Sequence, residues 1–372
     1  MGHLHREKEE VYRALVGTLD RNPPGAPYTE TLLSILKHLY TEEEARLGSE
    51  FPGFINSWDD LKEKTSLGEK ELSYHLDNMV AKGLVTDLKT RGNTYYMLTP
   101  MVVGFFEYTF MRAPSDLPME ELAQLFEEYF KENGVAEGIF GGNTRMFQAW
   151  AYEKFIPPEV ETEVMDYEKA SAMIREAGGG ALTDCSCRHK AWHLGKNCDA
   201  PVDVCTSLGK AAEWLIEKGF ARRAGVDELL RVLDRTEEYG LVHLADNVQK
   251  EPAYLCHCCG CCCGPLRAIK EQGVMSVHPS NFIPAFNLEN CSGCGSCAEK
   301  CHLGAIKIVE ETPGDKNSRY PVLNEDICIG CGICIDACKK DAVYLLRRQT
   351  LHIPPAGKKD QMIRMAMDRG KK

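Results

Sequence analysis

The amino-acid sequence predicts an α+β, multidomain fold, on three observations. Apolar residues recur at helical spacing through the first 80 residues and then occur in two short strand-like runs. Residues 114–184 carry 15 acidic and 5 basic side chains, within a chain of net charge −11. All 18 cysteines lie between Cys185 and Cys338. Because the composition changes along the chain and 372 residues exceed one ordinary core, we expect several separately packed parts.

The pattern of the first 110 residues predicts helices followed by a β-hairpin. The pairs Thr41/Glu44 and Ser66/Glu69 have the spacing of capping boxes, in which a hydroxyl and a carboxylate satisfy free amides at a helix start. We expect a helix over 69–82, ended by Gly83, and strands over 84–87 and 94–98. This order resembles a winged helix-turn-helix domain.

That resemblance implies DNA binding through the helix at 69–82, but the charges on this helix argue against it. Its outward positions include Glu69, Glu71 and Asp77, and Lys70 is the single early cation. Carboxylates that face phosphate groups repel them. We therefore expect a packing or docking module and not a DNA-binding domain.

Two cysteine runs near the C-terminal end share the spacing C-x2-C-x2-C-x3-C. The first run holds Cys291, Cys294, Cys297 and Cys301, and the second holds Cys328, Cys331, Cys334 and Cys338. Thiolates at this spacing on a tight loop can bind several irons of one 4Fe–4S cube. A zinc ribbon uses paired C-x2-C knuckles and leaves half of each run unexplained. We therefore expect two 4Fe–4S clusters.

The segment 287–346 resembles a bacterial-type two-cluster ferredoxin domain. In that family the fourth cysteine of each run binds the other cluster. The resemblance thus implies one cluster on Cys291, Cys294, Cys297 and Cys338, and another on Cys328, Cys331, Cys334 and Cys301. The proline that usually follows the fourth cysteine is replaced here by His302 and Lys339.

Ten further cysteines lie upstream, and they are candidate metal ligands too: Cys185, Cys187, Cys198, Cys205, Cys256, Cys258, Cys259, Cys261, Cys262 and Cys263. Disulfides are not expected in a compartment that keeps thiols reduced. Zinc is an alternative, but the neighbouring ferredoxin-like segment favours at least one further iron–sulfur cluster. The ligands of that cluster cannot be assigned from the spacing.

Two details of this region give sharper expectations. If the loop is extended, side chains alternate, so that Cys259, Cys261 and Cys263 share one side and Cys256, Cys258 and Cys262 the other. The tripeptides at 258–260 and 262–264 both read Cys-Cys-Gly, which resembles in part the noncubane sites of heterodisulfide reductases.

These interpretations divide the chain into five segments. We expect a winged-helix-like N-terminal domain at 1–112, an acidic helical connector at 113–184, a mostly helical cysteine-rich middle at 185–285, a ferredoxin-like dicluster domain at 286–346 and a basic tail at 347–372. The tail is expected to be solvated chain or a tether for an acidic partner. The whole arrangement resembles cysteine-rich 4Fe–4S binding proteins of anaerobes.

The predicted function is electron transfer, either as a carrier or as the wiring subunit of an anaerobic oxidoreductase. The sequence holds no Gly-x-Gly-x-x-Gly after a strand, no P-loop and no nucleophile elbow. The alternatives are a catalytic iron–sulfur thiol/disulfide reductase in the middle segment and an iron–sulfur redox-sensing regulator. We expect a flavoprotein or oxidoreductase subunit as partner, no membrane span and a cytoplasmic location. Among the histidines, His257 is the first to test as a ligand.

Overall fold

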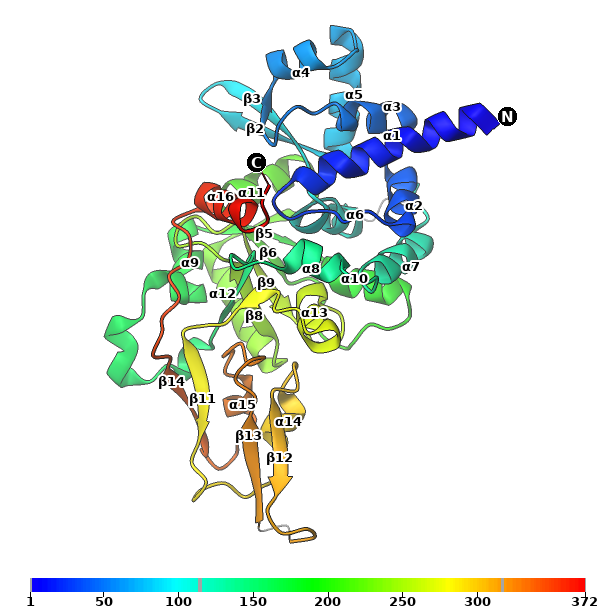
Figure 1. The fold of residues 1–372 in the computed structure, drawn as a ribbon. Coiled ribbons are helices and arrows are strands. Elements are labelled where there is room, and N and C mark those ends of the chain that lie inside the picture. The colour runs from blue at the N-terminus through cyan, green and yellow to red at the C-terminus, as the bar shows by residue number, and fades with distance from the viewer. Residues whose placement is uncertain (1, 113–115, 316–317, 372) are drawn as a thin grey trace. The chain divides into compact units, whose positions relative to one another are not determined.

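The computed structural model describes residues 2–112, 116–315 and 318–371 (Figure 1). Its internal contacts divide the chain into two compact units. The first unit comprises the chain up to Gly142 together with residues 189–196 and the segment from Ile363. The second unit comprises residues 143–188 and 197–362 and contains every cysteine. Each described helix is too short or too polar to span a membrane.

The N-terminal part of the first unit has the predicted helices and hairpin. Its elements are α1 (Gly2–Arg21), α2 (Glu30–Leu39), α3 (Glu42–Ser49), β1 (Asn56–Ser57), α4 (Trp58–Lys64), α5 (Glu69–Lys82), β2 (Val85–Thr90) and β3 (Asn93–Leu98). The strands form one antiparallel sheet in the order β1-β3-β2. Leu72, Leu76 and Met79 form the buried face of α5, and Gly83 ends this helix with φ 77°.

The two predicted capping boxes have different outcomes. Thr41 and Glu44 form the predicted box at the start of α3, with amide-to-side-chain distances of 3.2 and 2.8 Å. The box at Ser66 is wrong, because α5 begins later, after Gly68, whose amide donates to Glu71 at 3.4 Å.

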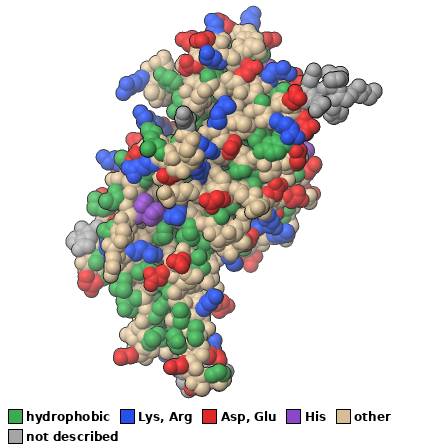
Figure 2. Space-filling model, viewed as in Figure 1, with side chains coloured by type: hydrophobic (Ala, Val, Ile, Leu, Met, Phe, Trp, Pro, Cys, Tyr) green, Lys and Arg blue, Asp and Glu red, His purple; other side chains and the backbone are tan. Residues whose placement is uncertain are grey.

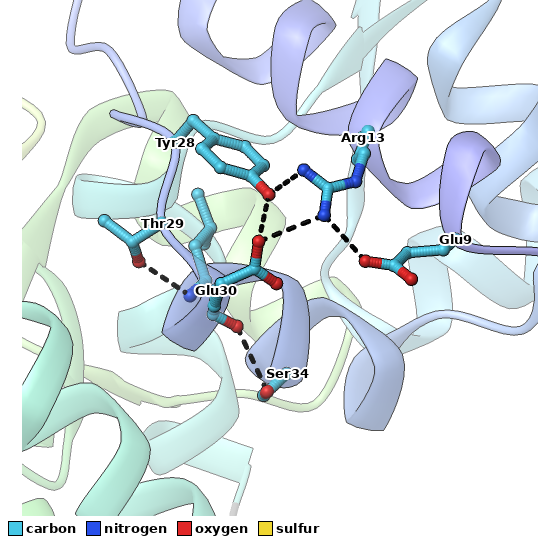
Figure 3. A network of polar contacts seen from close by, with 7 residues as sticks. Glu9, Arg13, Tyr28, Thr29, Glu30 and Ser34 are labelled. Carbon is cyan, nitrogen blue, oxygen red and sulfur yellow. Dashed lines mark hydrogen bonds and ion pairs between the residues drawn. The ribbon is translucent and has the colours of Figure 1, made fainter. Parts of the chain in front are cut away.

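An exposed polar network joins α1 to the start of α2 (Figure 3). Arg13 donates to Glu9 at 2.7 Å and to Glu30 at 3.0 Å, and it also contacts the Tyr28 hydroxyl. Tyr28 donates to Glu30 at 2.5 Å, and this hydrogen bond is the main reason that the pKa of Glu30 is lowered. Since these groups face solvent, we assign the network to local order and not to the functional site.

The rest of the first unit is helical and has an aromatic core. It contains η1 (Met101–Phe105), α6 (Phe106–Arg112), α7 (Met119–Tyr129) and α8 (Val135–Phe140). Phe106 and Phe126 stack edge-to-face at 5.1 Å between ring centres. Lys190, which is contributed by residues 189–196, pairs with Glu127 at 2.5 Å, and both side chains are nearly inaccessible to solvent.

A seven-stranded sheet organises the second unit. Its strands are β4 (Phe147–Trp150), β5 (Gly180–Thr183), β6 (Cys205–Leu208), β7 (Arg222–Ala224), β8 (Val242–Asp246), β9 (Tyr254–Cys258) and β10 (Val277–His278). Their order is β10-β4-β8-β9-β6-β5-β7, antiparallel except for the parallel pair β10–β4. The prediction of a mostly helical middle omits this sheet, because the strands are short and most of them show no clear alternation of buried and exposed residues.

Helices in the second unit pack against this sheet. They are η2 (Glu153–Phe155), η3 (Pro158–Glu163), η4 (Asp166–Glu168), α9 (Ala170–Ala177), α10 (Ser186–His193, of which the first three residues belong here), α11 (Gly209–Glu217), α12 (Val226–Glu238) and α13 (Gly264–Gln272). Ile174, Leu229 and Leu233 from α9 and α12 pack with Leu182 and Leu255 from the strands in one buried core.

The C-terminal part of the second unit is built from two short antiparallel pairs and two short helices. These are β11 (Phe282–Phe286) with β14 (Val343–Arg347), β12 (Ile306–Glu310) with β13 (Arg319–Leu323), and the helices α14 (Ser296–Lys300) and α15 (Ile333–Asp336). Each cysteine run therefore passes through a short helix into a strand. Arg347 ends β14 and forms a buried ion pair with Glu168 at 3.0 Å.

The last helix, α16 (Lys358–Asp368), contradicts the expectation of a solvated tail, whereas the tether for an acidic partner stays a prediction. Lys358 pairs with the buried Asp246 at 2.9 Å, and the Gln361 amide donates to the carbonyls of Met146 and Asn247 at 3.2 Å. Met365 is fully buried. At least one methionine of this helix is thus packed inside the molecule.

Candidate metal centres

Four cysteines from both runs line the first ferredoxin-like cavity. Cys291, Cys294 and Cys297 come from the loop before α14 and its first turn. The fourth, Cys338, follows α15 in the other run. The cavity that they surround measures about 240 Å³.

The second cavity has the reciprocal composition. Cys328, Cys331 and Cys334 line it together with Cys301, which ends the first run. The structure therefore brings together the two crossed sets of four cysteines that the ferredoxin resemblance implies. Helices α14 and α15, one from each run, pack against each other, and each cavity takes its fourth cysteine from the other run.

Backbone amides point at several of these sulfurs. The amides of Gly293, Ala305 and Ala342 donate to Cys291, Cys301 and Cys338 at 3.4, 3.3 and 3.3 Å. Such donors stabilise thiolates, which are the metal-binding form. Gly330 is required for the second loop, because it has φ 67° and a Cβ there would lie 2.0 Å from the Phe282 carbonyl. The cysteines, amides and glycines all suit 4Fe–4S clusters.

The two cavities differ in exposure. Burial raises the pKa of Cys331 to about 12, whereas the pKa of the exposed Cys294 is lowered, chiefly by a hydrogen bond with Ser296. A cluster in the first cavity would therefore lie close to solvent, and a cluster in the second would lie inside the unit.

His302, which replaces the usual proline after Cys301, connects this region to the cysteine-rich turn. Its Nδ1 accepts from the Gly260 amide at 3.2 Å, and its Nε2 lies 2.7 Å from the Gly240 carbonyl. Since Nδ1 accepts, the proton is assigned to Nε2, which donates to Gly240. A Cβ on Gly260 would lie 2.5 Å from the His302 carbonyl, so glycine permits this close approach.

The ten upstream cysteines form two groups. Cys198, Cys259, Cys261 and Cys262, here called the four-cysteine group, have all their sulfurs within 4.8 Å of one another. The others, called the six-cysteine group, are joined by sulfur–sulfur hydrogen bonds: Cys185, Cys187, Cys205, Cys256, Cys258 and Cys263.

Strand β9 explains part of this division and a turn explains the rest. Cys256 and Cys258 lie two residues apart on β9 and share a side, as predicted. The prediction for Cys262 and Cys263 is wrong: Cys262 joins Cys259 and Cys261, whereas Cys263 joins Cys258. Strand alternation stops at Cys258, because the chain then turns into α13, which begins after Cys263.

A buried arginine that sequence reasoning missed lies beside both groups. Arg188 is 1% exposed and donates to the carbonyls of Pro201 at 2.9 Å and His257 at 2.5 Å. Burial alone would lower its pKa, but the charges of Cys185, Cys259 and Cys258 outweigh burial and raise it. The sequence feature that could have indicated this role is the position of Arg188 directly after Cys185-x-Cys187, since a cation there can offset thiolate charge.

Three of these cysteines have a lowered pKa, and in Cys256 the cause is hydrogen bonds with Cys205 and Cys258. The pKa of Cys259 is lowered to about 4, first by a hydrogen bond from Cys262 and then by Arg188. Hydrogen bonds from Cys187 and Cys258 lower the pKa of Cys263 to about 6. Ionised thiols of this kind bind metals readily.

His257 does not join its cysteine neighbours. Its Nδ1 lies 2.9 Å from the Thr236 hydroxyl, and its ring meets that of His243 edge-on at 5.1 Å. Since side chains alternate along β9, His257 faces away from Cys256 and Cys258. Burial lowers the pKa of His243 to about 3 and that of His257 as well, so both rings are neutral. This arrangement favours a structural role.

Comparison with known proteins identifies one family within the chain. Residues 290–342 match the 4Fe–4S dicluster domain. This match covers both cysteine runs and supports an iron–sulfur domain at this end of the chain. Among curated proteins, no significant match to the chain is found.

Proposed function

We propose that this chain is a cytoplasmic iron–sulfur electron-transfer protein that carries two 4Fe–4S clusters and at least one further cluster upstream. The observation that carries the proposal is the pair of cavities, each lined by three cysteines of one run and the last cysteine of the other. The dicluster match at 290–342 supports the same reading. Each cluster would accept one electron from a reduced neighbour and pass it on, with no bond made or broken in the protein.

The arrangement of residues supports an internal route from the second cavity to the cysteine-rich turn. Cys301 lines that cavity, and the next residue, His302, accepts from the amide between Cys259 and Cys261. Lys154 joins the dicluster part to helix α12, since it pairs with Asp336 at 3.1 Å and with Glu237 at 3.3 Å. These contacts connect the dicluster part to the cysteine-rich turn and to α12.

The first cavity is the proposed exit to a redox partner, a flavoprotein or an oxidoreductase subunit. The exposed Lys339 and Lys340 line it together with Cys294. Apolar side chains are exposed on the neighbouring strands, among them Val309 and Val322, and Figure 2 shows apolar atoms gathered in this part of the unit. A partner with an acidic rim and an apolar centre would suit this surface.

Iron and acid-labile sulfide in the anaerobically purified chain test the proposal. Two ferredoxin-type clusters and one upstream cluster predict at least about 12 iron atoms per chain, with matching sulfide. Dithionite reduction should give electron paramagnetic resonance signals from interacting 4Fe–4S clusters. About eight irons per chain would contradict the upstream cluster alone, whereas an iron-free chain would contradict the function.

For the N-terminal helices and hairpin, we propose a winged-helix-like docking module. Glu69, Glu71 and Asp77 are exposed on α5, and Lys62 pairs with Glu69. At physiological salt we expect no sequence-selective complex with duplex DNA tighter than about 1 μM, as measured by fluorescence anisotropy. Changing Glu69, Glu71 and Asp77 together to Lys should strengthen non-selective binding, because it removes the repulsion.

A sub-micromolar complex that prefers one sequence and weakens in Tyr74→Ala would contradict the docking role. Tyr74 is the large exposed side chain on the same helix, so it is the first candidate to read a base edge. Such a result would support the redox-sensing regulator instead.

A further inference from the structure

We propose that the four-cysteine group holds a single zinc ion in tetrahedral coordination, and not an iron–sulfur cluster. The group consists of Cys198, Cys259, Cys261 and Cys262. The ion would clamp the loop after α10 to the turn between β9 and α13.

The sulfur–sulfur distances fit one shared ion. All four sulfurs lie within 4.8 Å of one another, with Cys198 3.6 Å from Cys259 and Cys261 3.7 Å from Cys262. Four sulfurs around one zinc at about 2.3 Å must be about 3.8 Å apart at the edges of a tetrahedron. The separations of 3.6 and 3.7 Å agree with that edge.

The ferredoxin-like cavities of the same chain provide the contrast. The thiolates of a 4Fe–4S cube bind four different irons, so they lie farther apart than thiolates that share one ion. Among the described residues, the four-cysteine group is the sole set of three or more such ligands within 4.8 Å of one another. The crossed sets surround open cavities instead. The chain therefore builds two distinct kinds of cysteine site.

The chemistry of the group selects zinc. Four thiolates with tetrahedral geometry suit zinc among the divalent ions, and a closed set of four ligands is typical of structural zinc. Arg188 lies against Cys259 and offsets part of the negative charge that four thiolates leave on such a site.

The zinc ion would fix the positions of turn residues that contact other parts of the second unit. Gly260 lies between two of the ligands and donates to His302, beside the second ferredoxin-like cavity. Cys258 and Cys263 flank the same turn and belong to the six-cysteine group. Zinc at this site would thus fix the six-cysteine group and the dicluster part in position relative to each other. Of the 18 cysteines, eight then line the ferredoxin-like cavities, four bind zinc and six remain as candidate ligands of the upstream cluster.

The test is metal analysis of the full chain, produced with both iron and zinc in the medium and purified without oxygen. We expect about one zinc per chain, with an X-ray absorption spectrum of four sulfurs at about 2.3 Å from zinc. Cys262→Ser and Cys198→Ser should each lower the zinc content about tenfold. The matched control Cys294→Ser should lower iron and leave zinc unchanged, because Cys294 lines the first ferredoxin-like cavity.

Two outcomes would overturn the proposal. One is wild-type protein without stoichiometric zinc, a result that does not depend on how any variant folds. The other is loss of iron with Cys262→Ser while zinc stays unchanged, which would place iron in the group. Iron and zinc are counted separately, so failure of this proposal is distinguishable from failure of the electron-transfer function.

Discussion

Changing Cys301 to alanine is expected to abolish the cluster of the second cavity, although Cys301 belongs to the first cysteine run. The side chain lines the same cavity as Cys328, Cys331 and Cys334. Removing one of four thiolates from a buried cube leaves an iron without a ligand. We expect a loss of about four irons per chain from that cavity. Iron analysis and the low-temperature resonance spectrum of the reduced protein measure this loss.

Cys338→Ala is the matched control, because Cys338 ends the other run and lines the first cavity. It should remove the solvent-exposed cluster and spare the buried one. The two variants should therefore retain different clusters, which the spectra can tell apart when each is compared with Cys294→Ser. If Cys301→Ala instead gives the spectrum of Cys294→Ser, the crossed ligand sets are wrong.

Arg188→Leu is expected to have the largest effect outside the ferredoxin-like cavities. The guanidinium is buried, donates to two carbonyls and lies beside thiolates of both upstream groups. Removing one partner of a buried charge pair costs about 3–5 kcal/mol, because the other charge is left without compensation. We expect a lower free energy of unfolding by this amount in urea titration, together with loss of metal from the upstream groups.

Two further variants distinguish the effect of losing a buried charge from the effect of losing any arginine ion pair. Arg235→Leu breaks an exposed pair with Asp203 and should change the free energy of unfolding by less than about 1 kcal/mol. Arg188→Lys keeps the charge and loses the fork of donors, so it should retain more metal than Arg188→Leu. Equal stability of Arg188→Leu and Arg235→Leu would show that Arg188 does not offset thiolate charge.

Local chemistry made several parts of this protein predictable. The capping box at Thr41 and the helix end at Gly83 depend on residues within one turn, and both have the predicted geometry. Cys256 and Cys258 share a side because alternation is a property of the strand itself. Where the deciding interaction spans few residues, the amino-acid pattern is sufficient.

Other predictions failed because the deciding contacts are distant in the chain. The seven-stranded sheet has strands of two to five residues, most of them buried, so no clear alternation marks them. Gln361 looks like a surface residue in sequence, yet it is buried and donates to carbonyls far upstream in the chain. The role of Arg188 depends on carbonyls and thiolates brought close by the fold.

The cysteines show, within one motif, both what the local sequence determines and what only the fold determines. The sequence by itself determined that 18 thiols are gathered for metals and that eight have ferredoxin spacing, because ligand spacing on a tight loop is local. Only the tertiary structure decided that Cys198 meets a turn 61 residues later and that Cys262 and Cys263 belong to different groups. The physical reason is that a metal site is defined by sulfur positions in space, and the turn after β9 sends neighbouring thiols in opposite directions.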